Sequence, residues 1–166
     1  MAGLVDALVS LLQKEAENCE NLLALALEKK DVIVANDTEA LQKITALENR
    51  IVGRNARLEK ERQALVSDIA AVLNADVETL TLGALLQRIE GTPEHAALAA
   101  VRDRLRAAAG DLIAANNQNR LLVENALDYI DFSMNMLSGA ASDEASYLPF
   151  KGDAITANHM FFDARQ

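Results

Sequence analysis

Hydrophobic residues recur at steps of three and four along most of this chain, which is the spacing of residues on one face of an α-helix. Four stretches carry this period, at about 4–35, 37–73, 82–90 and 93–138. Turn-forming residues interrupt it, among them Asn36, Asp37 and Gly91. The pattern therefore predicts an all-α fold of three long helices and one short helix.

The boundaries between these stretches predict how the helices connect. Asn36, Asp37 and Thr38 join the first two helices, and so short a connection makes them antiparallel neighbours. We expect Asn36 to cap the second helix, with Glu39 three residues later. Pro93 is suited to the first position of the third long helix. Because a helix rises by about 1.5 Å per residue, the expected architecture is an elongated antiparallel helical bundle or coiled coil.

The predicted second helix carries a heptad repeat. Apolar residues recur every seven positions from Ile44 to Val72, as in the seam of a coiled coil. The neighbouring column is polar in its middle, where Glu48, Asn55 and Arg62 follow one another at the same interval. Polar residues inside a seam cost stability but fix its register, whereas at the edge of a bundle they face water. We favour the second interpretation here.

The stretch 112–137 has no Pro or Gly and carries more apolar surface than one core face needs. Two stripes lie side by side on it. The first stripe comprises Leu122, Ala126, Tyr129, Ser133 and Met136, and the second stripe comprises Val123, Leu127, Ile130, Met134 and Leu137. Either this is a central helix with neighbours on both sides, or one stripe meets the core and the other binds another protein.

The residues after the third long helix, 139–166, have no long helical period but contain scattered apolar residues, including Phe150, Phe161 and Phe162. These apolar residues are too many for a purely solvated tail and too few for a folded unit. We therefore expect a flexible tail with short apolar anchors. Such a tail docks on its own bundle, on a partner, or on a second copy, which makes self-association through the tail one of the expected interactions.

Composition narrows the classes of function. The chain has 166 residues, enough for one domain with a core, and a formal charge of −9, which opposes binding to nucleic acid and to anionic membranes. The single cysteine, Cys19, excludes an internal disulfide and is expected in the core. There is neither a basic, apolar signal peptide nor an apolar run long enough to insert into a membrane. We expect a cytoplasmic protein.

Motifs for catalysis and metal binding are missing. The two histidines, His95 and His159, lack the Glu three residues earlier that a di-iron bundle needs. No Cys/His cluster matches a zinc site, and no glycine-rich loop or Ser/His/Asp set is present. The sequence therefore predicts no catalytic, cofactor or metal site, and no enzymatic activity.

Five features, taken in order, resemble the FlgN family of flagellar type III export chaperones, and the likeness covers nearly the whole chain. They are the helix–turn–helix pattern from Leu22 to Ile51, Arg62 followed by Leu65, the short segment TLGALLQRI at 81–89, the Asn-rich entry at 116–119 into LLVENALDYIDFSMNML, and an aromatic residue followed by glycine between Tyr147 and Gly152.

The resemblance implies a cytoplasmic chaperone that binds and shields the C-terminal helical segment of hook–filament junction (hook-associated) proteins and delivers them to the type III export gate. It also implies that the client lies on the C-terminal part of the third long helix, which agrees with the doubled stripe. The expected client surface is Val123, Leu127, Ile130, Met134 and Leu137, with Phe132 beside them. For the export gate, the resemblance points to Tyr147. The alternative is a non-enzymatic coiled-coil adaptor or scaffold.

Overall fold

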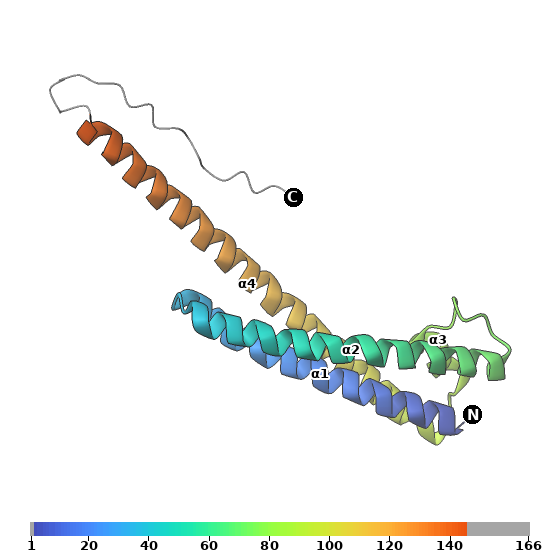
Figure 1. The fold of residues 1–166 in the computed structure, drawn as a ribbon. Coiled ribbons are helices and arrows are strands. Elements are labelled where there is room, and N and C mark those ends of the chain that lie inside the picture. The colour runs from blue at the N-terminus through green and yellow to red at the C-terminus, as the bar shows by residue number, and fades with distance from the viewer. Residues whose placement is uncertain (1, 146–166) are drawn as a thin grey trace. The chain divides into compact units, whose positions relative to one another are not determined.

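The chain folds into four α-helices, and no strand occurs among the residues described. A computed structural model describes the backbone of residues 2–145 and the side chains of residues 3–139. The helices are α1 (Ala2–Val34), α2 (Thr38–Leu73), α3 (Leu82–Arg88) and α4 (Pro93–Ala145) (Figure 1). The predicted all-α fold of three long helices and one short helix is confirmed.

The turn between α1 and α2 uses its two central residues differently from the prediction. Asn36 adopts φ 56°, in the left-handed region that Asn tolerates, and ends α1 with its N–H donating to the Ile33 carbonyl at 3.1 Å. Asp37 is the N-cap of α2, since its Oδ1 accepts from the Ala40 N–H at 2.9 Å. The expectation that Asn36 caps α2 was therefore wrong, because that residue closes the preceding helix.

The ends of α3 and α4 follow from local chemistry. Thr81 caps α3, with its Oγ1 accepting from the Ala84 N–H at 3.1 Å. Helix α4 begins at Pro93, as predicted, but continues through Gly139 to Ala145. The predicted end at 138 was wrong because one glycine costs a helix only about 1 kcal/mol, and alanines at 140, 141 and 145 favour the helix around it. The remainder of the predicted tail, 146–166, lies outside the described residues.

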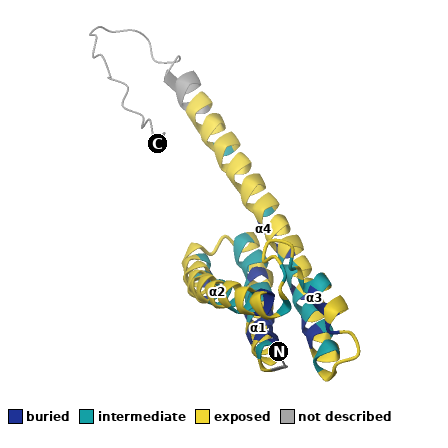
Figure 2. Cartoon of the chain, turned by 90° about the vertical axis from the view of Figure 1, so that its right-hand side faces the viewer, coloured by how far each residue is buried: buried dark blue, intermediate teal, exposed yellow. Residues whose placement is uncertain are grey.

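The main core lies where four helix segments meet: the start of α1, the end of α2, all of α3 and the start of α4 (Figure 2). Leu8 and Leu98 are fully buried at its centre. Its buried members are Val5, Leu8, Val9, Leu12, Ile69, Leu85, Leu86, Ile89, Leu98 and Val101. The short helix α3 and its C-cap residue Ile89 thus contribute three apolar side chains to this core.

Helices α1 and α2 form an antiparallel pair whose contact surface contains matched polar residues (Figure 1). Glu48 forms an ion pair with Lys29, and the Asn18 Nδ2 donates to the Asn55 Oδ1 at 2.7 Å. The Arg62 Nε lies 3.3 Å from the Glu15 Oε1. The expectation that Glu48, Asn55 and Arg62 face water was wrong, because each has a polar partner on α1.

The chain divides into two compact units whose boundary lies inside α4, between Ala126 and Leu127. The first unit contains α1, α2, α3 and the beginning of α4. The second unit begins at Leu127, and its described part is the rest of α4. No helix of the described chain combines the length and hydrophobicity needed to cross a membrane.

Candidate functional site

The second half of α4 exposes most of its apolar side chains. Of the sixteen large hydrophobic residues that are exposed among the described side chains, nine lie between Leu121 and Leu137. Their exposed fractions run from 39% at Val123 to 72% at Tyr129. Figure 2 shows this part of α4 almost uniformly in the colour of exposed residues. An apolar surface of this kind on one helix is a candidate binding site.

Both stripes predicted on this helix are exposed. In the second stripe, Leu127 is 55% exposed and Leu137 is 68% exposed. In the first stripe, Tyr129 and Met136 are equally open, and only Leu122 and Ser133 are half-buried. Most members of both stripes are thus exposed among the described residues.

Two serine hydroxyls on this helix donate to carbonyls of the helix itself. The Ser133 Oγ donates to the Tyr129 carbonyl at 2.8 Å, and the Ser138 Oγ donates to the Met134 carbonyl at 2.9 Å. Such back-bonding leaves these serines without an unmet hydrogen-bonding need. The apolar face is therefore able to lose water without leaving these hydroxyls unpaired.

One edge of the same helix is acidic. Glu124, Asp128 and Asp131 follow at intervals of four and three, so they share a face, and all three are exposed. The only cation near them in sequence is Arg120, whose Nε lies 3.9 Å from the Glu124 Oε1. No Lys or Arg follows Arg120 within α4. The surface thus combines apolar stripes with an unbalanced negative edge.

Polar contacts hold the first half of α4 against α1. The Asn119 Nδ2 donates to the Ala26 carbonyl at 2.7 Å, in a buried position. The Arg104 guanidinium binds both carboxylate oxygens of Glu20, each at 2.7 Å, and this hydrogen bonding lowers the pKa of Glu20. Neither contact was predicted from the sequence. The sequence contains one signal for the Asn119 contact, which is an Asn at an apolar heptad position. It contains none for the contact between Arg104 and Glu20, because these exposed residues are far apart in the sequence.

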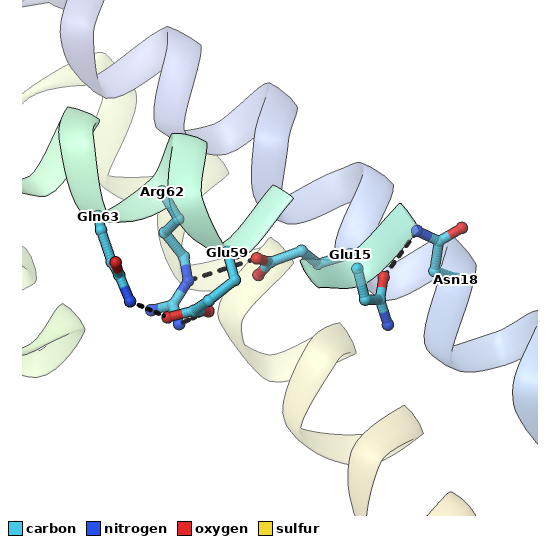
Figure 3. A network of polar contacts seen from close by, with 6 residues as sticks. Glu15, Asn18, Glu59, Arg62 and Gln63 are labelled. Atoms are coloured by element: carbon cyan, nitrogen blue, oxygen red, sulfur yellow. Dashed lines mark hydrogen bonds and ion pairs between the residues drawn. The ribbon is translucent and has the colours of Figure 1, made fainter. Parts of the chain in front are cut away.

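A cluster of charged groups lies where α1 and α2 meet, around Arg62 (Figure 3). Arg62 forms ion pairs with Glu15 of α1 and with Glu59 of its own helix, and the Gln63 Nε2 donates to Glu59 at 3.0 Å. Burial raises the pKa of Glu15 against the opposing effect of the Arg62 charge. The hydrogen bond from Arg62 lowers the pKa of Glu59. One arginine is thus shared by two carboxylates, and this pairing between helices is typical of a structural cluster.

The remaining candidate residues do not form a reactive site in the described chain. Cys19 is half-buried rather than in the core, and burial raises the pKa of its thiol, with Glu15 and Glu20 adding to the effect. A raised pKa makes the thiol a poor nucleophile at neutral pH. No group of three or more His, Cys, Asp or Glu side chains within the described residues is arranged to hold a metal ion. Tyr147 and His159 lie outside the described residues.

A family model described as FlgN protein matches residues 1–150. The chain belongs to the FlgN family. The resemblance inferred from the motifs is thus confirmed, and FlgN proteins are chaperones of flagellar protein export. Comparison with curated proteins gave no match, and neither did comparison with solved structures. In this FlgN protein, the feature that fits a chaperone is the exposed apolar surface of α4.

Proposed function

We propose that this FlgN protein acts in the cytoplasm by binding the amphipathic C-terminal helix of hook–filament junction proteins on the second half of α4. It shields that helix before export and delivers the client to the type III export gate. The observation that carries the proposal is the continuous exposed apolar surface between Leu121 and Leu137. In a family of export chaperones, such a surface is suited to a client helix that aggregates when left uncovered.

The physical basis is helix-to-helix recognition. Apolar side chains spaced at three and four residues make a row that an amphipathic client helix matches with a row of its own. Burial of that surface contributes about 25 cal/mol per Å² before the costs of ordering and association are subtracted. Those costs leave a moderate net affinity, which a chaperone needs because it must release its client.

We assign the client contact to the second stripe, with Phe132 beside it. The members of the second stripe, Val123, Leu127, Ile130, Met134 and Leu137, are all exposed and all lack a polar group. The first stripe instead contains Tyr129, whose hydroxyl is polar. An interface that must exclude water is better served by the wholly apolar stripe. The two Met residues of the surface, Met134 and Met136, suit adaptable packing.

Titration calorimetry with synthetic C-terminal helices of hook–filament junction proteins tests this assignment. Leu127→Asp and Ile130→Asp should each weaken binding by about tenfold or more, because each places a charge in an apolar contact. Met136→Asp is the matched control, since it adds the same charge at a similarly exposed position of the first stripe. It should bind the client nearly as well as the unmodified protein, and circular dichroism should show equal helicity in all three variants.

The outcomes separate the alternatives. Equal losses from Met136→Asp and Leu127→Asp would mean that the client contacts both stripes. Unfolding of the Leu127→Asp and Ile130→Asp variants would mean that these residues are structural. If the unmodified protein binds none of the client helices, the non-enzymatic helical adaptor becomes the better description, and its partner should be sought among proteins that are not exported.

Delivery to the export gate is proposed to involve Tyr147, on the strength of the family relationship alone. Tyr147→Ala should weaken binding to the purified cytoplasmic domain of the export gate, whereas Tyr129→Ala removes an aromatic ring from α4 and serves as the control. Client affinity should be unchanged in the Tyr147 variant. Unaltered gate binding by Tyr147→Ala would remove this residue from the proposal.

A further inference from the structure

An open groove runs between α1 and α2. It consists of two adjoining hollows of about 440 and 330 Å³, both lined only by α1 and α2, and Arg54 borders both. Leu25 of α1 and Leu47, Ile51 and Leu58 of α2 supply apolar lining. A separate hollow that includes Leu105 of α4 is bordered by other α2 positions, Val52, Asn55, Ala56 and Glu59. The groove therefore uses a different face of α2 from the one near α4.

A row of arginines forms the α2 edge of this groove. Arg50, Arg54 and Arg57 follow at intervals of four and three, so they share one helix face, and all three are exposed. None of them makes a hydrogen bond or an ion pair among the described residues. The groove also carries Lys14, Glu17 and Glu28 on α1, and Glu61 at the end of the α2 row. The groove lining therefore has a small net positive charge, and its arginines all lie on α2.

The second half of α4 has the complementary features. Glu124, Asp128 and Asp131 have the same spacing as the arginine row, and they lie beside the exposed apolar residues Leu127 and Phe132. Asp128 and Asp131 make no ion pair among the described residues. We propose that the groove between α1 and α2 binds the second half of α4 of a second copy of this chain, with the acidic row against the arginine row.

Helix geometry supports this pairing. Each row extends over seven residue steps, or about 10.5 Å along its helix, so two adjacent parallel helices align all three charge pairs at once. Apolar side chains next to both rows are buried by the same contact. A reciprocal arrangement of two copies repeats the contact about a two-fold axis and closes the assembly as a dimer. The second contact doubles the surface area that the dimer buries. This matters because specific interfaces bury about 1,600 Å² in total.

The dimer has a regulatory consequence, and this step rests on the proposed function. The helix that enters the groove is the helix proposed to carry the client, so docking covers the client surface. The dimer is then the unloaded form of the chaperone, in which the exposed apolar stripes are protected from other proteins. A client helix competes with the second copy, and client loading is accompanied by dissociation of the dimer.

Charge reversal tests the dimer directly. In analytical ultracentrifugation at about 50 mM salt, the unmodified full chain should dimerise, and the dimer should weaken at about 500 mM salt. Arg54→Glu and Asp128→Arg should each raise the dimer dissociation constant by about tenfold or more, because each places like charges opposite one another in both contacts. Arg106→Glu reverses an exposed arginine of α4 outside the groove and should leave the dissociation constant unchanged.

Mixing the two variants provides the decisive step. In a mixed dimer, one contact brings the glutamate introduced by Arg54→Glu against the arginine introduced by Asp128→Arg. The second contact retains its native Arg54 and Asp128, so both contacts attract. An equimolar mixture of the two variants should therefore dimerise where neither variant does alone. Failure of the mixture to dimerise would overturn the proposal. So would a dimer that forms only when both substitutions are in one chain, since the proposed contacts attract equally in the mixture.

Client titration distinguishes the failure of this inference from the failure of the proposed function. A protein that is monomeric at about 100 µM but binds client helices would overturn the dimer and retain the chaperone site. A charge-dependent dimer without client binding would support the dimer contact and remove its regulatory role. Tighter apparent client binding by Arg54→Glu than by the unmodified protein would support competition between client and second copy.

Discussion

The beginning of α1 and the second half of α4 have similar apolar periodicity but opposite environments. Leu8 and Leu12 of α1 are within 1% of complete burial, whereas Leu127 and Ile130 of α4 are more than half exposed. The difference arises because the segment of α1 meets α2, α3 and the start of α4 in one core. An apolar period thus identifies a helix face that binds something, and the tertiary structure decides whether the partner belongs to the same chain.

The polar residues of the two regions differ in the same way. On the α1–α2 contact, Asn18, Asn55, Glu15 and Arg62 are partly buried and paired with one another. Matched polar pairs of this kind set the register of adjacent helices, because a shifted alignment leaves them unpaired. On α4 the acidic row is exposed and unbalanced. Polar residues therefore contribute to fold specificity in the first region and are available to partners in the second.

The largest expected effect comes from truncating a leucine in each region. Leu8→Ala should lower the free energy of unfolding by about 2–5 kcal/mol, because it leaves a cavity in the core. Leu127→Ala should change it by less than about 0.5 kcal/mol, since an exposed side chain loses little burial. Urea denaturation followed by circular dichroism measures both. A comparable loss in the two variants would break the contrast and place Leu127 in a core.

A smaller effect is expected at Asn119, where α4 is joined to α1. Asn119→Ala removes the side-chain hydrogen bond to the Ala26 carbonyl and should lower the free energy of unfolding by about 0.5–1.5 kcal/mol. The neighbouring Asn117 is exposed, so Asn117→Ala is the control and should be nearly neutral. The same urea experiment applies. A neutral Asn119→Ala would indicate that this hydrogen bond does not contribute to the attachment of α4.

The smallest expected effect is a difference in pH dependence between two glutamates that contact Arg62. Burial raises the pKa of Glu15 above its ordinary value of 4.5, so its stabilising contribution is complete below pH 4.5 and is lost as the pH rises through the raised pKa. The Glu15→Gln side chain does not ionise, so the variant does not lose this stability as the pH rises. The free energy of unfolding of the variant, relative to the unmodified protein, should therefore increase between about pH 4 and about pH 7.

Glu59→Gln is the matched comparison and should show the opposite trend. The hydrogen bond from Arg62 lowers the pKa of Glu59, so its contribution is present above pH 4.5 and is lost as the pH falls through the lowered pKa. Relative to the unmodified protein, this variant should lose stability as the pH rises from about 3 to about 5. Parallel trends in the two variants would show that the difference in burial between Glu15 and Glu59 has no energetic consequence.

Much of the fold was predictable because helix period and turn chemistry are local properties. The period predicted all four helices, and Pro93 predicted where α4 begins. The same reasoning chose Asn36 over Asp37 as the cap of α2, since sequence alone does not show which of two adjacent capping residues takes the left-handed conformation. It also placed Glu48, Asn55 and Arg62 in water, because their partners on α1 lie more than fifteen residues away in the chain.

The candidate surface was predictable in part for the same reason. The two stripes on α4 follow from the order of residues, and all six residues expected to bind the client are exposed. The helices, their apolar faces and the motifs that resemble the FlgN family follow from the order of residues. Which of those faces are covered depends on packing between segments far apart in the chain. The core at α3 is filled by such segments, and both stripes of α4 remain exposed.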